Sequence, residues 1–349
     1  GAALEVLLAL GDLLLLVDPA RPLDDYVQMM EAAGIHVERL VIHHNLDVSL
    51  IWRLWRRLRR ARPDLVHTHL LHADLYGGLA ARLAGCRWGA SRHNDNPFRA
   101  RQPYRSVLRA LWSITDAGIA ISSAVRRFTI EAEGAAPDKL TVIPYGIEPS
   151  QSVDMQAVRP SLRRSLSLPD DALLVGIVSR LIEQKGIADG LRAFRQIVRE
   201  FPSAYLLIVG DGPLRASLEQ EAQALGLQER THFLGWRTDA PAIMVGLDIF
   251  LMPSLWEGFG LTLLEAMNAS LPVVATAVSA IPEVVADEET GLLAPARDPS
   301  ALTAALRRLL GDESLRQQMG SAGCERVRTH FSADSMVDRT TDLYRRVVG

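Results

Sequence analysis

The chain has 349 residues, of which 48% are hydrophobic and 23% charged, with a net charge of −3. This is the composition of an ordinary soluble globular protein, and the length predicts two domains rather than one core. We expect a cytoplasmic protein, because no apolar run approaches a membrane span, no basic-then-apolar leader opens the chain, and Cys86 and Cys324 give no disulfide framework.

Strand and helix patterns alternate through the first half of the chain. Two apolar runs, 4–10 and 13–17, open it with only Gly11 and Asp12 between them. Parallel strands need a longer crossover, so we expect the first domain to be incomplete at its start. The predicted elements that follow are helices 24–33, 49–62, 73–83, 104–112 and 124–132 and strands 37–42, 65–69, 88–92, 117–121 and 140–144. Their alternation predicts a parallel sheet covered on both faces.

Helix 49–62 combines an apolar face with many arginines. Ser49 is a candidate N-cap. The predicted apolar face has helical spacing and consists of Ile51, Leu54, Trp55 and Leu58. The helix lies in a basic stretch, 51–127, that holds 15 arginines against four acidic residues. Two interpretations remain: a solvated helix packed on the sheet, or a surface that binds an anionic membrane with Trp52 at headgroup level. We expect no nucleic-acid partner.

Three histidines follow closely on the predicted strand 65–69. His67 and His69 share one side of that strand, and His72 lies just beyond it. No cysteine or acidic cluster nearby completes a tetrahedral site, so we predict strand-end residues near a ligand site and no metal.

The second half repeats the alternation after a polar, proline-containing stretch. We place a first domain at 1–150, a linker at 151–171, a second domain at 172–330 and a C-terminal helix, 331–349, that could pack back on the first domain. The second domain has predicted strands 173–179, 205–209, 232–234, 248–252, 273–275 and 292–293 and helices 187–199, 214–225, 240–245, 301–310 and 313–328, with a further helix from Leu261.

A short glycine-containing loop joins strand 248–252 to the helix that begins at Leu261. Gly258 and Gly260 permit a sharp turn, and backbone N–H groups of Gly260, Leu261 and Thr262 at a helix N-terminus favour an anion.

Two carboxylates border this corner, Glu257 before the turn and Glu265 inside the helix. Because a carboxylate repels phosphate, each is better suited to accept hydrogen bonds from sugar hydroxyls. Arg180 and Lys185 follow strand 173–179 and place two cations at the same edge, since ligands of open α/β sheets bind beyond the carboxyl ends of the strands. The expected occupant is an anion with two phosphates.

These residues resemble a known family. Glu257 and Glu265, in a Glu-Gly-Phe-Gly context, are similar to the Glu-x7-Glu motif of the retaining glycosyltransferases of family 4. The stretches 179–186, 209–213, 142–147, 67–69 and 91–94 are also similar to motifs of that family, with Ser179 and Tyr145 as departures. The resemblance covers the chain from about Pro22 and implies the GT-B fold, two Rossmann-like parallel-sheet domains facing across a cleft.

The resemblance also implies the roles of the residues. The substrate would be a nucleotide-diphosphate sugar, UDP- or GDP-linked, whose diphosphate is neutralised by Arg180 and Lys185. Glu265 would hold the ribose, Glu257 the transferred sugar, and His93 would face that sugar from the first domain. The acceptor would be a hydroxyl of a glycan or lipid-linked molecule, and the anomeric configuration would be retained.

No cofactor and no metal are expected, because the chain has no Asp-x-Asp and two cations take the metal's place. A nicotinamide oxidoreductase would need Gly-x-Gly-x-x-Gly, which is absent. A nucleotide-sugar epimerase of the same fold and a catalytically inactive sugar-nucleotide-binding protein remain the alternatives.

Overall fold

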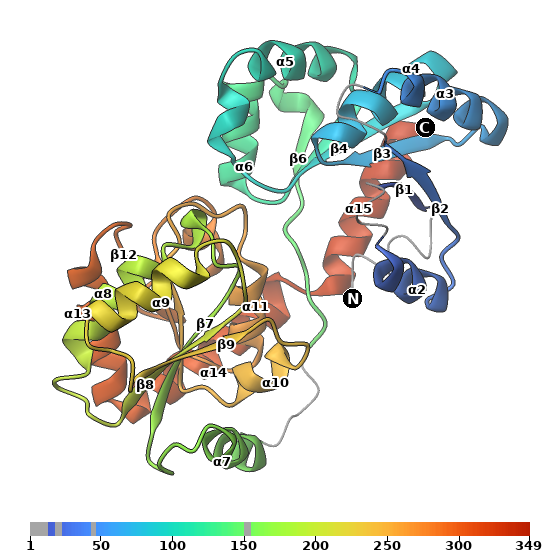
Figure 1. The fold of residues 1–349 in the computed structure, drawn as a ribbon. Coiled ribbons are helices and arrows are strands. Elements are labelled where there is room, and N and C mark those ends of the chain that lie inside the picture. Colours follow the sequence, from blue (N-terminus) through green and yellow to red (C-terminus); the bar gives the residue numbers. More distant parts are fainter. Residues whose placement is uncertain (1–12, 18–22, 43–46, 150–154) are drawn as a thin grey trace. The chain divides into compact units, whose positions relative to one another are not determined.

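A computed structural model describes residues 13–17, 23–42, 47–149 and 155–349. The chain divides into two compact units, Gly1–Glu148 with Ala333–Gly349, and Pro149–Ser332 (Figure 1). We call them unit 1 and unit 2. The apolar run 4–10 lies outside the described residues. Both units are α/β with parallel sheets, which confirms the predicted fold class.

Unit 1 contains a four-stranded and a two-stranded parallel sheet. The larger sheet has the order β3-β4-β5-β6, and the smaller one pairs β1 with β2. The strands are β1 (Leu13–Val17), β2 (Val37–Val41), β3 (Leu65–His69), β4 (Arg87–Arg92), β5 (Ala117–Ala120) and β6 (Leu140–Val142). Apolar side chains such as Trp88 and Trp112 are almost fully buried and form the core beside the larger sheet.

The helices of unit 1 lie close to the predicted ranges, with two internal changes of type. They are α2 (Asp24–Ala32), α3 (Ser49–Ala61), η1 (Ala73–Gly78), α4 (Leu79–Ala84), η2 (Pro97–Ala100), α5 (Tyr104–Ile114), α6 (Ser123–Phe128), η3 (Thr129–Glu133), η4 (Pro137–Lys139) and α15 (Ala333–Val348). The predicted helices 73–83 and 124–132 each contain a π-helical stretch, η1 and η3. Such stretches are frequent at functional sites.

The predicted apolar face of α3 packs on the core of unit 1, together with Leu50, which the prediction left out. Leu50, Leu54 and Leu58 are buried, whereas Ile51 and Trp55 are only partly buried. Ser49 is the first helical residue rather than the N-cap, and its hydroxyl donates to Asp47 instead of capping the helix. The i, i+4 row packs on the core because helical side chains lean toward the N-terminus.

Unit 2 is built on one six-stranded parallel sheet with the order β12-β11-β10-β7-β8-β9. The strands are β7 (Leu173–Val178), β8 (Ala204–Val209), β9 (Thr231–Gly235), β10 (Ile249–Met252), β11 (Val273–Thr276) and β12 (Gly291–Ala294). The first three strands run outward on one side of β7, and the next three run outward from β10 on the other. This is the doubly wound order of a Rossmann fold, with its switch point between β7 and β10.

Helices cover both faces of that sheet (Figure 1). They are α7 (Met155–Ser165), η5 (Glu183–Lys185), α8 (Ile187–Ile197), α9 (Arg215–Ala224), α10 (Ala240–Val245), α11 (Leu261–Asn268), α12 (Ile281–Val284), α13 (Pro299–Gly311) and α14 (Glu313–His330). The predicted linker 151–171 was wrong in its described part, because it contains α7. Arg163 of α7 is buried and donates to Asp248 of unit 2 at 2.7 Å, so α7 belongs to that unit.

The C-terminal helix α15 belongs to unit 1. Leu343 packs with Ala117 and Ile119 of β5, and the Tyr344 hydroxyl bonds to His67 of β3. Among the described residues, none of the helices combines the length and the apolar character needed to cross a membrane.

Candidate active site

The switch point of unit 2 brings two of the predicted loops together. β7 pairs directly with β10, so the loop after β7 and the loop after β10 lie side by side. The backbone N–H of Leu255 donates to Gln184 O at 2.7 Å, and Gln184 Nε2 donates to Trp256 O at 3.1 Å. The two loops therefore form one hydrogen-bonded surface at the edge where open α/β sheets bind ligands.

Lys185 and Glu257 form an ion pair at this edge. Lys185 Nζ lies 2.5 Å from Glu257 Oε2, and both side chains are largely buried. The Ser279 hydroxyl accepts from the Glu257 backbone N–H at 3.2 Å, which fixes the backbone before the turn. A cation and a carboxylate are thus in contact at this edge of the sheet.

Glycines let the backbones of these loops approach closely. Gly186 has φ +58°, and a Cβ there would lie 2.0 Å from Pro253 O. Gly260 has φ +85° and precedes α11, whose first N–H groups have no intrahelical acceptor. Only glycine allows both the positive φ and the close contact at residue 186, so this residue is required for the two loops to pack.

Arg180 and Glu265 are the exposed charged residues of the predicted set. Neither side chain has a hydrogen-bond or ion-pair partner among the described residues. Surrounding protein atoms desolvate the Glu265 carboxyl and raise its pKa. The predicted residues Arg180, Lys185, Glu257, 260–262 and Glu265 all lie in unit 2. His93 lies in unit 1, and its predicted contact with the sugar stays a prediction.

His93 lies just after β4 in a row of near-parallel rings. His93 Nε2 lies 2.9 Å from His69 Nδ1, and His93 Nδ1 lies 2.5 Å from the Tyr145 hydroxyl. His69 stacks on His67, whose Nε2 lies 2.8 Å from Ser91 Oγ. Both ring nitrogens of His93 therefore already have partners inside unit 1.

These histidines are held neutral. Burial, together with His69 and the nearby arginines Arg92 and Arg99, lowers the pKa of His93 to about 3. Burial also lowers the pKa of His67 and His69. A neutral imidazole can orient or accept a hydroxyl, but it carries no positive charge near pH 7.

His67, His69 and His72 lie at or just after the end of β3, as predicted, but they do not form one cluster. His72 stacks on Tyr76, whereas His93 takes the third place in the histidine row. Among the described residues, no group of three or more histidines, cysteines or acids could hold a metal ion.

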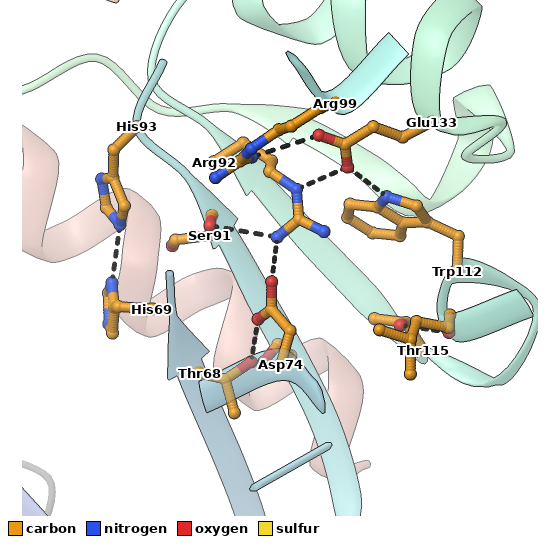
Figure 2. Close-up of polar contacts among 12 residues, drawn as sticks. Thr68, His69, Asp74, Ser91, Arg92, His93, Arg99, Trp112, Thr115 and Glu133 are labelled. Atoms are coloured by element: carbon orange, nitrogen blue, oxygen red, sulfur yellow. Dashed lines mark hydrogen bonds and ion pairs between the residues drawn. The ribbon is translucent and has the colours of Figure 1, made fainter. Parts of the chain in front are cut away.

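A buried charge network, which was not predicted from the sequence, lies on the opposite face of the same strand end (Figure 2). Arg92 is 2% exposed, donates to Asp74 and Glu133 at 2.7 Å each, and lies over the Trp112 ring at 4.7 Å. Arg99 Nη1 reaches the second Glu133 oxygen at 3.1 Å.

The two carboxyls of this network respond differently to burial. Burial raises the pKa of Asp74, although Arg92 opposes it. At Glu133, Arg92 and Arg99 together overcome burial and lower the pKa. The signals available in the sequence were an arginine at the end of the predicted strand 88–92 and a glutamate directly after the predicted helix 124–132.

Comparison with known families agrees with this architecture. Residues 16–151 match the model "Glycosyltransferase Family 4", and residues 158–326 match "Glycosyl transferases group 1". The chain is 36% identical over 299 residues to a lipopolysaccharide core biosynthesis glycosyltransferase, LpsD, of Rhizobium meliloti, covering 86% of this chain and 80% of the relative. It is 28% identical to an Escherichia coli UDP-Gal:alpha-D-GlcNAc-diphosphoundecaprenol alpha-1,3-galactosyltransferase, covering 95% and 88%.

Solved structures show the same fold. Anabaena Alr3699/HepE in complex with UDP and glucose superposes with a TM-score of 0.83 at 23% identity, covering 92% of this chain and 89% of that one. Sucrose-phosphate synthase of Thermosynechococcus elongatus gives a TM-score of 0.77 at 23% identity, covering 97% and 99%.

Two parallel-sheet units of this kind, with these structural neighbours, define the GT-B fold. The chain belongs to the family 4 type of these enzymes and is a glycosyltransferase, which confirms the family that its motifs resemble. The comparisons give no support to the epimerase alternative.

Proposed function

We propose that this glycosyltransferase moves a sugar from a nucleotide-diphosphate sugar to a hydroxyl acceptor with retention of configuration and without a metal. The observation that carries the proposal is the hydrogen-bonded pair of loops at the switch point of unit 2, which bears Lys185 and Glu257 in contact. A diphosphate fits beside Lys185 and the N-terminus of α11, and a sugar fits beside Glu257.

The chemistry follows from where charge develops. As the bond between the sugar and the diphosphate breaks, negative charge grows on the leaving oxygen, and Arg180 and Lys185 stabilise it there. Backbone N–H groups of 260–262 add fixed donors. Because these groups are already in place before the reaction, they take the role that a divalent cation would otherwise have.

Each carboxylate has one task in this proposal. Glu265 accepts from the ribose hydroxyls, and its exposure leaves it accessible to the nucleotide. Glu257 accepts from hydroxyls of the transferred sugar. His93, which is neutral, is proposed to meet that sugar through a hydrogen bond once it exchanges one of its internal partners.

The comparisons favour UDP over GDP and a glycan or glycolipid acceptor. Structural neighbours are described with UDP or UDP-glucose. The relatives include an enzyme of lipopolysaccharide core biosynthesis and one that acts on a diphosphoundecaprenol-linked sugar, while another is GDP-mannose-dependent. We propose a UDP-sugar donor, with GDP-sugars as the second choice.

A donor screen tests the proposal. Calorimetry with UDP, GDP, ADP and dTDP identifies the base, and mass spectrometry with the matching sugars and methyl glycosides detects transfer. Arg180→Ala and Lys185→Ala should each weaken binding of the chosen diphosphate by about 10- to 150-fold, which corresponds to about 1.5–3 kcal/mol.

The metal and the stereochemistry need separate measurements. Transfer should survive excess EDTA, and NMR of the product should show the anomeric configuration of the donor. Unchanged diphosphate affinity in both variants, activity restored only by magnesium, or an inverted product each contradicts its part of the proposal.

We further propose that α3 attaches unit 1 to the anionic cytoplasmic face of a membrane. Trp52 is 56% exposed and lies under Arg56, at 5.4 Å from the guanidinium carbon to the ring centroid. Arg56, Arg59 and Arg60 form no ion pair with a described residue, whereas Arg53 and Arg57 pair with Asp47 and Glu38. Free basic residues near an anionic surface contribute about 1 kcal/mol each.

Liposome co-sedimentation decides this point. Binding should require anionic lipid, fall at high salt, and drop when Arg56, Arg59 and Arg60 are replaced by glutamate. Replacement of the already paired Arg53 and Arg57 by glutamine should matter less. Equal binding to neutral and anionic vesicles, or none to either, contradicts membrane attachment.

A further inference from the structure

The Tyr145 hydroxyl holds one ring nitrogen of His93. It lies 2.5 Å from His93 Nδ1, and the two rings are nearly parallel, with 8° between their planes and 5.9 Å between their centroids. Turning the imidazole over would place a carbon against Tyr145 and another against His69, so both hydrogen bonds would be lost. His93 therefore has one ring orientation that satisfies both of its nitrogens.

The backbone on either side of Tyr145 is anchored within unit 1. Ile143 is buried, and its N–H donates to Ala120 O at 2.9 Å. The Gly146 N–H donates to Met336 Sδ at 3.4 Å. Because the chain is held before and after Tyr145, its hydroxyl is a fixed point to which the imidazole is bound.

His69, the partner of the other nitrogen, is easier to exchange. It is an exposed residue, whereas Tyr145 is half-buried. His69 Nδ1 lies 2.9 Å from His93 Nε2 (Figure 2), and His69 Nε2 has no hydrogen-bond partner in the described part of the chain. A ligand hydroxyl that displaces His69 leaves Tyr145 in place, so Nε2 is the nitrogen that His93 can offer.

The phenol also selects the tautomer of the imidazole. Burial raises the pKa of Tyr145 to about 12, so its hydroxyl keeps its proton near pH 7. A neutral imidazole has one N–H group and one acceptor nitrogen. When Tyr145 donates to Nδ1, the ring proton is on Nε2, and His93 then offers a donor at that nitrogen.

We propose that Tyr145 is a positioning residue for glycosyl transfer, which fixes the ring and the tautomer of His93 so that Nε2–H donates to a hydroxyl of the transferred sugar. The inference rests on the proposed function, because it specifies how His93 meets that sugar. A donor that is oriented before the sugar arrives needs no reorganisation during the reaction.

Nitrogen-15 NMR of the whole chain tests the tautomer without any substrate. Loss of signals in His93→Gln identifies those of His93. In the wild-type protein near pH 7, the shifts should show a protonated Nε2 and an unprotonated Nδ1. Tyr145→Phe keeps the ring and removes the hydroxyl, so the Nδ1 signal should shift as its hydrogen bond is lost. A protonated Nδ1 in the wild type, or an unchanged Nδ1 signal in the variant, overturns the inference.

Steady-state kinetics separate positioning from a structural role. With UDP-glucose as donor and methyl α-glucoside as acceptor, Tyr145→Phe should lower kcat by about tenfold and change KM for the donor by less than about twofold. Tyr104→Phe is the matched control, because Tyr104 is exposed and contacts only the edge of Phe98 among the described rings. A lower melting temperature with unchanged kcat in Tyr145→Phe would mean that the hydroxyl serves stability alone, which overturns the inference.

The two readouts also distinguish this inference from the proposed function. A wild-type protein that turns over none of UDP-glucose, UDP-galactose and UDP-N-acetylglucosamine contradicts the proposed function and, with it, the role of Tyr145 in transfer. The NMR result would still decide whether Tyr145 fixes the tautomer of His93. Turnover in the wild type with unchanged kcat in Tyr145→Phe overturns the inference and leaves the proposed function standing.

Discussion

The carboxyl edges of the four-stranded sheet of unit 1 and the six-stranded sheet of unit 2 differ in the side chains that they present. In unit 2, glycines bring backbones together, Arg180 and Glu265 are exposed, and Lys185 pairs with Glu257 and with no other described residue. In unit 1, Arg92 is fully buried and satisfied on several sides, and the histidines beside it are neutral. The two edges therefore differ in function: that of unit 2 presents charged side chains that a diphosphate can contact. At that of unit 1, the described Arg92 is already paired and the histidines carry no charge.

The largest predicted loss of stability follows from disrupting the buried charge network of unit 1, which consists of Arg92, Asp74, Glu133 and Arg99. Arg92→Met leaves Asp74 and Glu133 buried without their common partner, and breaking a buried ion pair in this way costs about 3–5 kcal/mol. Urea unfolding followed by tryptophan fluorescence measures the loss. Arg87→Met is the control, because the pair of Arg87 with Asp116 is largely exposed on the arginine side and is worth at most about 1 kcal/mol. Equal losses in the two variants would show that the buried network has no special weight.

The next largest effect is expected when the close backbone contact between Gly186 and Pro253 in unit 2 is disrupted. Gly186→Ala must place a Cβ 2.0 Å from Pro253 O at φ +58°. We expect a loss of about 2–4 kcal/mol and weaker UDP binding, since the left-handed conformation and the collision both cost free energy.

Gly226→Ala is matched to that change. Its φ is +68°, but a Cβ there has nothing within 4 Å. It should lose only about 1–2 kcal/mol and keep its UDP affinity. If both variants unfold at the same urea concentration and bind UDP alike, the loop contact is not what prepares this edge.

The third prediction concerns pH and belongs to unit 1. The folded protein holds His93 at a pKa of about 3, and the pKa of His67 is also depressed. An unfolded histidine titrates near 6.5, so between about pH 6.5 and 3 the unfolded state binds more protons. Stability is therefore complete above about pH 6.5 and falls on acidification by about 1.4 kcal/mol per pH unit for each such histidine.

A matched pair of variants tests whether the buried histidines cause this dependence of the unfolding free energy on pH. His93→Gln should make the loss of stability with falling pH shallower, and the exposed His330→Gln should leave it unchanged. Unfolding free energies measured from pH 7 to pH 4.5 provide the comparison. An unaltered slope in His93→Gln would mean that carboxylates, and not this row of rings, govern acid stability.

Much of the fold could be predicted because its strands and helices follow from the local spacing of apolar residues. The alternation of apolar strands with amphipathic helices predicted the parallel-sheet architecture of both units, and glycines beside charged residues predicted the switch-point loops of unit 2. The network of unit 1 could not be predicted this way. Glu133 lies 41 residues from Arg92, and Tyr344 lies 277 residues from His67. Such pairs follow from tertiary packing, which a single sequence does not display.

The smallest predicted effect is a change in UDP affinity when Glu257 of unit 2 is replaced. Lys185 is paired with Glu257, so a diphosphate must compete with that carboxylate for the ammonium group. Glu257→Gln removes the competitor. UDP should then bind slightly more tightly, by about two- to fivefold, because such a partly buried pair is worth about 0.4–1 kcal/mol. Transfer should nevertheless fall, since the amide accepts sugar hydroxyls less strongly than the carboxylate.

Glu265→Gln is the comparison variant for Glu257→Gln. Glu265 has no ion-pair partner among the described residues, so its replacement releases no cation and should only weaken UDP binding through the ribose. The change in UDP affinity should therefore have opposite signs in these two variants, whose glutamates lie eight residues apart. Calorimetry with UDP, alongside turnover with the identified donor, measures it. If both variants bind UDP more weakly, Glu257 supports the nucleotide rather than restraining Lys185. The free charges of unit 2 would then be less available to a diphosphate than its exposed edge suggests.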